Sequence, residues 1–240
     1  MLKTSASTGR HRPQGVDILY EDRDILVVDK AAGLLTMATD REKEKTAYHR
    51  LTDYVRKGCS KSRNRIFIVH RLDREVSGIL VFAKTPEAKT SLQGQWERTD
   101  KKYLAVVHGH FADQTGKFSS YLAENTALVV YSTLDKKKGK LAHTGYRVLK
   151  ETPDYSLLEI DLLTGRKHQI RVHMAENGRP IVGDKKYGPG DKDHARLALH
   201  AHSITFTHPY SGKPISFTAP IPRYISGLVG GIAPNELKPR

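Results

Sequence analysis

A polar segment between two apolar runs is the feature that most constrains the fold of this chain. Residues 66–69 and 79–82 have the length and composition of buried strands. Between them lies HRLDREVSG, residues 70–78, in which five of the first six side chains are charged or imidazole groups. Such groups cannot all be buried beside two strands without partners. We therefore expect residues 70–78 to form an irregular loop held against a sheet, and loops on a rigid scaffold often carry catalytic groups.

The same loop also has a purely structural interpretation. Asp73 and Ser77 are common turn-capping residues, and Gly78 supplies backbone freedom. For an arbitrary charged loop, turn capping is the more frequent role. Residues 70–78 alone therefore do not establish a functional site.

Most other periodic segments have the character of strands. Short apolar or alternating runs predict further strands at residues 17–20, 25–28, 103–107, 127–131, 142–150, 155–163, 197–206 and 215–218. Helices are expected at 46–57 (ended by Gly58), from Thr85 onward, and at 168–177 (ended by Gly178). Many strands with few, scattered helices favour an α+β fold with a mixed, mainly antiparallel sheet.

The chain is expected to contain one large folded domain. No internal repeat, low-complexity tract or interdomain linker is visible, so we expect a flexible basic arm at 1–15, a domain at 16–232 and a tail at 233–240. No apolar run approaches the ~18 residues of a membrane span, and the N-terminus lacks the apolar core of a secretory signal. Cys59 is the only cysteine, which excludes an intrachain disulfide and suits a reducing cytoplasm.

The charge balance indicates a polyanionic partner. Forty Lys and Arg residues against 26 Asp and Glu residues give a formal net charge of +14. Nucleic acid is the commonest soluble polyanion, and the basic loops at 56–65 and 136–140 could grip its phosphates. A merely solubilising surface is the alternative. An anionic membrane is less favoured, because no basic amphipathic helix stands out.

Two further segments combine polar and aromatic groups. In GRKHQIRVH, residues 165–173, helical spacing places His168 with Arg171 and Gln169 with His173. The two histidines are five apart with no acid between them, so a catalytic metal is disfavoured even with His200 or His202 as a third ligand. The segment KKYLAVVHG, residues 101–109, fits either an ordinary edge strand or an aromatic platform for a base.

Taken together, these segments resemble the RluA-type family of RNA pseudouridine synthases. The resemblance is carried by the segments HRLDREVSGILVFAK, KKYLAVVHG and LLTGRKHQIRVHMAENGRPIVGDKKYG, with support from ILYEDRDILVVDKAAGLLT and RLALHAHSITFTHP. It covers roughly residues 17–220, with the motifs in the family's order. Val76 stands where the family usually has threonine, and Ala31 where it usually has proline. The small N-terminal RNA-binding domain of many relatives is not expected here.

The resemblance implies an isomerase that needs neither cofactor nor metal. Such an enzyme breaks the N-glycosidic bond of a uridine, turns the uracil and reattaches it through carbon 5. The resemblance makes Asp73 the catalytic carboxylate and Arg171 its cationic partner. Tyr103 would lie against the uracil and is a candidate base for the proton on carbon 5. Attack of Asp73 on the ribose and removal of a ribose proton both remain open.

The expected partner is RNA, either rRNA or tRNA, bound by a monomer without a membrane. The target base must leave its stack, and the planar guanidinium of Arg71 is suited to fill the space behind it. The residues expected to bind RNA are His70, Arg71, Arg74, Lys101, Lys102, Arg166 and His168. The main rival interpretation is an inactive RNA-binding protein with the same fold. A DNA-binding module and a metallohydrolase have less support, because their motifs are missing.

Overall fold

The computed structural model describes residues 13–37, 44–57, 59, 61–188 and 190–237. The chain divides into two compact units. The first runs to Thr99 and includes Ser203–Ala219, and the second comprises Asp100–His202 and the segment from Pro220 onward. Most of the predicted arm at 1–15, the predicted cap Gly58 and the end of the predicted tail lie outside the described residues.

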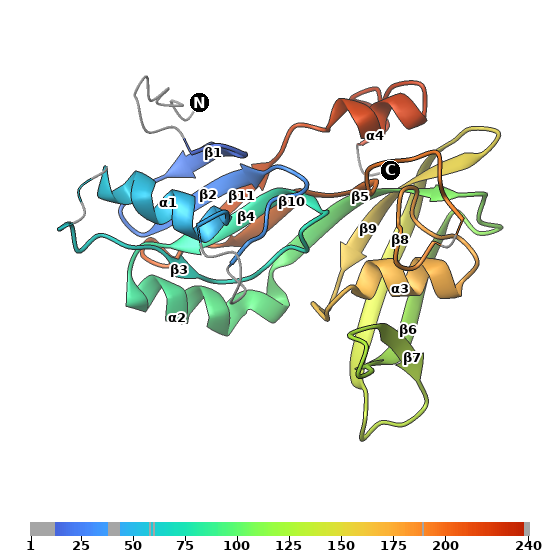
Figure 1. The fold of residues 1–240 in the computed structure, drawn as a ribbon, viewed down its shortest axis with the longest axis horizontal. Helices are drawn as coiled ribbons and strands as arrows, with labels where there is room; N and C mark the ends of the chain where they lie inside the picture. Colours follow the sequence, from blue (N-terminus) through green and yellow to red (C-terminus); the bar gives the residue numbers. More distant parts are fainter. Residues whose placement is uncertain (1–12, 38–43, 58, 60, 189, 238–240) are drawn as a thin grey trace. The chain divides into compact units, whose positions relative to one another are not determined.

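The first unit is built on antiparallel strand pairs (Figure 1). These are β1 (Val16–Glu21) with β2 (Ile25–Lys30), β2 with β4 (Ser77–Ala83), β3 (Phe67–Ile68) with β4, and β10 (Leu199–Thr207) with β11 (Pro214–Thr218). The pairing of β10 with β11 begins at Ser203. The predicted hairpin around residues 21–24 is thereby confirmed.

Two helices accompany these strands, and both begin at a threonine cap. Thr46 accepts from His49 N before α1 (Ala47–Arg56), and Thr85 accepts from Ala88 N before α2 (Pro86–Gln95). A short 3-10 helix, Trp96–Arg98, follows α2. The apolar faces meet in one core, whose buried members are Ile25, Val27, Val69, Ile79, Val81, Ala83, Ala88, Leu92, Ile204, Phe206 and Ala219. Burial of this core anchors the strands on either side of the 70–78 loop.

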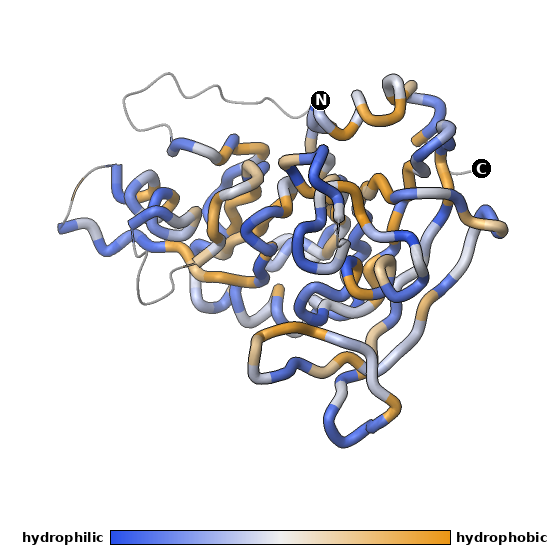
Figure 2. The backbone as a smooth tube through the Cα atoms, turned by 45° about the vertical axis from the view of Figure 1, so that its right-hand side comes forward, coloured by the Kyte–Doolittle hydropathy of each residue, from blue (hydrophilic) through white to orange (hydrophobic). Residues whose placement is uncertain are grey.

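The second unit contains an antiparallel sheet with strand order β5-β9-β8-β6-β7. Its strands are β5 (Asp100–His108), β6 (Thr115–Glu124), β7 (Val130–Thr133), β8 (Lys140–Glu151) and β9 (Tyr155–Leu162). Helix α3 (Gln169–Glu176) packs against β7 and β8 (Figure 1), and α4 (Arg223–Leu228) follows near the C-terminus. Hydrophilic segments are spread along the chain and not confined to one part of it (Figure 2). No helix among the described residues has the length and apolar character needed to span a bilayer.

The predicted α+β class is confirmed, and the structure differs from the local expectations at three places. The strand expected at 127–131 begins only at Val130, because Asn125 closes a turn with its backbone and side-chain oxygens, which accept from Leu128 N and Val129 N. Strand β6 was not predicted, because its residues are polar and largely accessible. The left-handed residue at the end of α1 is Lys57, one position before the expected glycine.

A like-charged pair lies between β1 and β2 in the first unit. Asp17 and Asp29 face each other in the strand register. Burial and the Asp17 carboxylate raise the pKa of Asp29 from 3.8 to about 6, against the opposing effects of the Lys30 charge and of Gly78 N. The folded state therefore binds the Asp29 proton more tightly than the unfolded chain. Stability from this group is complete below about pH 4 and is lost as the pH rises through 6.

Replacing Asp29 by asparagine should stabilise the protein at pH 7. We expect Asp29→Asn to raise the free energy of unfolding by about 1 kcal/mol, a value discounted for partial exposure. The variant should also lose the contribution that Asp29 makes to the pH dependence of unfolding between pH 4 and 6. Urea unfolding across this pH range measures both effects. Asp53→Asn, on the exposed face of α1, is the matched control and should change little. Equal pH profiles for wild type and Asp29→Asn would contradict the assignment.

Candidate active site

The loop that carries Asp73 is fixed by the segment that follows β2. The hydroxyl of Thr36 donates to Leu72 O at 2.9 Å and accepts from Leu72 N at 3.1 Å. Gly33 N donates to Arg74 O at 2.8 Å. The residues on either side of Asp73 are thus both bonded to a neighbouring segment, and its half-buried side chain is carried on a supported turn. Such support fixes the position of the side chain before a reaction begins, so less conformational entropy is lost in reaching the transition state.

The C-terminal half of the loop is closed by Val76 and Gly78. Val76 N donates to Asp73 O at 3.2 Å, and the Val76 side chain is 3% exposed. Gly78 has a φ of 112°, a backbone conformation that a side chain would strain. Where the resemblance leads one to expect threonine, this chain therefore places a buried apolar group. The hydroxyl of Thr36 orders the loop from the neighbouring segment.

A buried lysine lies beneath the same loop, and the sequence had not indicated it. The Nζ of Lys30 donates to Ala31 O at 3.0 Å, Leu34 O at 2.8 Å and Arg74 O at 3.3 Å, and the side chain is fully buried. Burial lowers its pKa from 10.5 to about 8, although the carboxylates of Glu75, Asp73 and Asp29 oppose this shift. At neutral pH the loop therefore rests on a positive charge. The only sequence signal was one lysine at the end of the apolar run ILVVDK.

The other loop residues predicted to bind RNA differ in their surroundings. The Nε2 of His70 accepts from Val81 N at 3.0 Å, and its ring stacks on Trp96 with centroids 4.3 Å apart. His70 therefore attaches the start of the loop to β4. Arg71 and Arg74 are exposed, and Arg74 Nε donates to Gly33 O at 3.1 Å.

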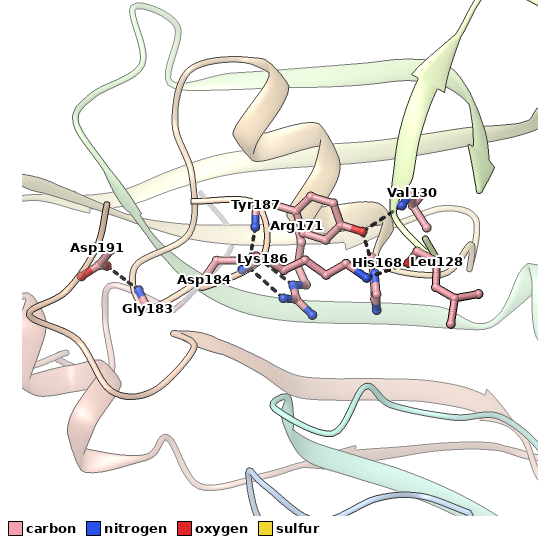
Figure 3. Close-up of polar contacts among 9 residues, drawn as sticks. All are labelled: Leu128, Val130, His168, Arg171, Gly183, Asp184, Lys186, Tyr187 and Asp191. Carbon is pink, nitrogen blue, oxygen red and sulfur yellow. Dashed lines mark hydrogen bonds and ion pairs between the residues drawn. The ribbon is translucent and has the colours of Figure 1, made fainter. Parts of the chain in front are cut away.

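In the second unit, Arg171 is held by a buried carboxylate (Figure 3). Its Nε and Nη2 donate to the two oxygens of Asp184, each at 2.8 Å, and the two side chains are only 6% and 0% exposed. Asp184 Oδ1 also accepts from Lys186 N and Tyr187 N, both at 3.0 Å. Burial by itself would raise the pKa of Asp184, but the hydrogen bonds and charge of Arg171 outweigh it and hold this pKa below its usual value. The result is a bidentate pair that fixes the guanidinium.

Tyr187 connects this pair to His168. The hydroxyl of Tyr187 lies 2.7 Å from Nδ1 of His168 and accepts from Val130 N at 3.1 Å (Figure 3). The guanidinium carbon of Arg171 lies 5.2 Å from the centre of the Tyr187 ring, within cation–π range. His168 precedes α3 with a left-handed φ of 52° and so is not part of the helix. Asp184 and Tyr187 belong to the sequence GDKKYG, part of a segment that carries the family resemblance, and no role was predicted for either residue.

Buried polar side chains attach α3 to β8. Gln169 Nε2 donates to Thr144 Oγ1 at 2.9 Å, and His173 Nδ1 lies 2.8 Å from the same oxygen. The predicted shared face of Gln169 and His173 is therefore confirmed. Gln169 Oε1 accepts from Arg166 N at 3.0 Å, which fixes the segment before the helix. These contacts determine the position of the backbone from which Arg171 projects.

The remaining predicted residues also lie in the second unit. Tyr103 is 9% exposed and pairs with Ile160 in the register of β5 and β9. Lys101 is buried at 8% exposure, while Lys102 forms an ion pair with Asp161. Arg166, a half-buried residue, donates from Nε to Leu141 O at 3.1 Å.

The structure brings together two groups of predicted residues. His70, Arg71, Asp73 and Arg74 share one loop of the first unit, and His168 and Arg171 share one hydrogen-bonded cluster of the second unit. Tyr103 belongs to the sheet of the second unit. The action of Asp73, Tyr103 and Arg171 on one substrate stays a prediction.

Removing the charge of Asp184 should destabilise the second unit strongly. Asp184→Asn leaves a buried guanidinium without its counter-ion, and we expect a loss of about 3 kcal/mol in urea unfolding at pH 7. Because the folded pKa of Asp184 is depressed, this contribution is complete above about pH 4 and is lost at lower pH. Asp161→Asn is the matched control, since its ion pair with Lys102 is partly exposed and should contribute less than about 1 kcal/mol. Equal losses in the two variants would contradict this account.

Comparison with known proteins identifies the family. Residues 24–176 match the family model described as RNA pseudouridylate synthase. An uncharacterized RNA pseudouridine synthase of Bacillus subtilis (strain 168) is 36% identical over 231 residues, which cover 93% of this chain and 75% of the relative. The ribosomal large subunit pseudouridine synthase D of Neisseria meningitidis serogroup A is 38% identical over 232 residues, covering 90% of this chain and 61% of that protein.

Solved structures agree on the fold. The human RNA pseudouridylate synthase domain containing 4 superimposes with a TM-score of 0.73 at 22% identity, covering 87% of this chain and 89% of that one. The human RNA pseudouridylate synthase domain containing 1 gives a TM-score of 0.72 at 24% identity, covering 90% and 88%. From the family match and the two bacterial relatives, this chain belongs to the RNA pseudouridine synthase family, a family of isomerases that act on RNA.

Proposed function

We propose that this protein converts a uridine in a structured rRNA or tRNA stem-loop into pseudouridine, with Asp73 as the catalytic carboxylate. The observation that carries the proposal is the support of the turn at Asp73. The buried ammonium of Lys30 and the hydroxyl of Thr36 form hydrogen bonds with the backbone of the residues on either side of it. A turn that only ended a strand could be formed without burying the charge of Lys30 against it. Burying that charge is costly, which is typical of functional sites.

The carboxylate of Asp73 would act on the ribose side of the glycosidic bond. It either attacks the ribose or removes a ribose proton, and both routes need the ionised form. The positive charge of Lys30 interacts with the carboxylates of Asp73 and Glu75. The Nζ bonds of Lys30 to three backbone carbonyls keep it in a positioning role.

Arg171 and Tyr103 would complete the catalytic group. Asp184 fixes one edge of the Arg171 guanidinium, so the side chain meets its substrate in a set orientation. A fixed donor stabilises developing charge better than a mobile one, because it needs no reorganisation during the reaction. We assign to Arg171 the neutralisation of the Asp73 charge, and to Tyr103 the contact with uracil and the removal of the carbon 5 proton.

RNA contact is assigned chiefly to exposed cations. Arg71 and Arg74 flank Asp73 on an exposed stretch, and Arg71 would occupy the place of the extruded base. Lys136–Lys138 form an exposed basic turn in the second unit, suited to phosphates. Lys101 is buried and Lys102 already pairs with Asp161, so a contact of either with phosphate would have to replace an internal one.

The name of one relative refers to the large ribosomal subunit, and this favours rRNA over tRNA as the substrate. The rival function is an RNA-binding protein without turnover, and a direct assay of the product separates the two.

Replacing Asp73 by asparagine should abolish turnover while RNA binding stays within a few fold of wild type. The substitution keeps the size of the side chain and removes the charge that the reaction needs. Bulk RNA from cells lacking the protein is the substrate, and mapping of new pseudouridines is the measurement. Glu75→Gln, which removes a charge from the same loop, is the matched control and should retain activity. Near-normal product from purified Asp73→Asn would sink the assignment, and no product from the wild type would favour the inactive RNA-binding protein.

A minimal hairpin carrying the mapped uridine should suffice as substrate. Sequence-specific recognition of RNA generally falls on unpaired loops, and the net charge of +14 provides affinity for the stem. Binding measured from 50 to 200 mM salt should weaken steeply, by about 10-fold or more. The same hairpin with cytidine at the target position should bind without reacting. If an intact ribosomal subunit is modified and every isolated hairpin fails, recognition by this chain alone is refuted.

A further inference from the structure

Three side chains in the second unit form a cluster that the proposed function does not use. His108 ends β5, and Asp191 and His194 lie on the segment after Gly190. Nε2 of His108 is 3.0 Å from Asp191 Oδ2, and Nδ1 of His194 is 2.8 Å from Asp191 Oδ1. One ligand atom from each residue lies within 4.8 Å of the others. Two imidazoles and one carboxylate are a set of ligands common in zinc proteins.

The carboxylate of this cluster is held by the backbone. The Asp191 side chain is 6% exposed, and Gly183 N donates to its Oδ2 at 2.6 Å (Figure 3). His194 N donates to Oδ1 at 3.1 Å. Backbone donors of this kind orient a ligating carboxylate and leave its remaining lone pairs for a cation.

The two histidine rings are also held in place. The ring of Tyr155 makes edge contacts with both, with centroids 5.5 Å from His108 and 5.8 Å from His194. The hydroxyl of Tyr155 lies 3.4 Å from Nε2 of His194, the nitrogen that faces away from Asp191. A metal-binding histidine usually donates its second ring N–H to such a partner. The His108 and His194 side chains are 36% and 23% exposed, which leaves a path for an ion.

We propose that His108, Asp191 and His194 bind one divalent transition-metal ion of the zinc type, with water as the fourth ligand. Zinc bonds of about 2.0–2.1 Å in a tetrahedron separate neighbouring ligand atoms by about 3.3 Å. The present separations of 3.0 and 2.8 Å run to different oxygens of Asp191, and the three ligand atoms lie within 4.8 Å of one another, so local adjustment of these side chains brings them to this spacing. When the ion binds, each neutral imidazole carries its proton on the ring nitrogen that does not bind the metal. For His194 this nitrogen is Nε2, which lies 3.4 Å from the Tyr155 hydroxyl.

A second cluster of metal-compatible residues in the described chain is less suited. Asp22, Asp24 and His208 also place ligand atoms within 4.8 Å. Asp22 already accepts from Asp24 N, Ile25 N, Tyr20 and His208. The second nitrogen of His208 accepts from two backbone N–H groups, so its lone pair is occupied and Nε2 keeps its proton. Neither cluster contains His168, His173, His200 or His202.

The proposed ion would connect β5 to the segment between Gly183 and His194. That segment carries Asp184 and Tyr187, which hold Arg171 and His168. The ion would therefore stabilise the support of Arg171 without touching a substrate. Its role is structural, and removing it with a chelator should leave the chemistry of uridine conversion available.

The test is zinc binding by the full chain without RNA. Cys59→Ser is the background, because it removes the only thiol. Calorimetric titration with Zn²⁺ should give one tight equivalent, and saturating zinc should raise the melting temperature by about 5–10 °C. Co²⁺ should give the intense visible absorption of a four-coordinate site. His194→Ala and His108→Gln should each weaken zinc binding by about 100-fold or more.

The matched control is His110→Gln, which changes a histidine two residues from His108 that contacts Thr152 O instead of Asp191. It should bind zinc as tightly as the background. His208→Gln, in the second cluster, should do the same. The proposal is overturned if the background binds no tight equivalent, or if His194→Ala and His108→Gln bind zinc as tightly as His110→Gln. Because no RNA is present, either result leaves the proposed turnover untouched.

Discussion

The buried ammonium of Lys30 is the interaction on which the Asp73 loop depends. Its three acceptors belong to the segment after β2 and to the loop itself, so one desolvated charge joins two pieces of chain that are far apart in sequence. A lysine can be buried only where carbonyls or carboxylates compensate for its lost hydration. The fold supplies both, which explains why residues 30–36 and 70–78 keep one fixed arrangement.

The second unit also contains a buried charge, but there it is a carboxylate paired with a guanidinium. The buried carboxylate of Asp184 accepts hydrogen bonds from the Arg171 guanidinium and from two backbone N–H groups. The Thr144 hydroxyl contacts the buried side chains of Gln169 and His173 on α3. In both units a side chain of the proposed site is supported by polar contacts and not by apolar packing alone. Polar contacts are directional, so they fix orientation as well as position.

Much of this arrangement could be predicted from the sequence. Strand periodicity gave the antiparallel α+β class, the spacing of apolar residues gave the helix expected at 46–57, and the Thr85 cap gave the start of α2. The loop at 70–78 was recognised because its polarity is incompatible with the strands beside it. Lys30, Asp184 and Tyr187 were missed, because each has one decisive partner at least thirteen residues away (Arg74, Arg171 and His168) and no local period marks them. Strand β6 was missed because most of its residues are polar or accessible and its few apolar side chains do not alternate regularly.

The left-handed backbone of His168 has a consequence for engineering. A residue with a side chain is strained there by about 1 kcal/mol, and glycine would relieve that strain. Glycine would also delete the imidazole that Tyr187 contacts. Backbone strain and the local hydrogen-bond network thus make opposite demands on this position. Because a hydrogen bond contributes about as much as this strain costs, unfolding measurements on His168→Gly compare the two terms directly.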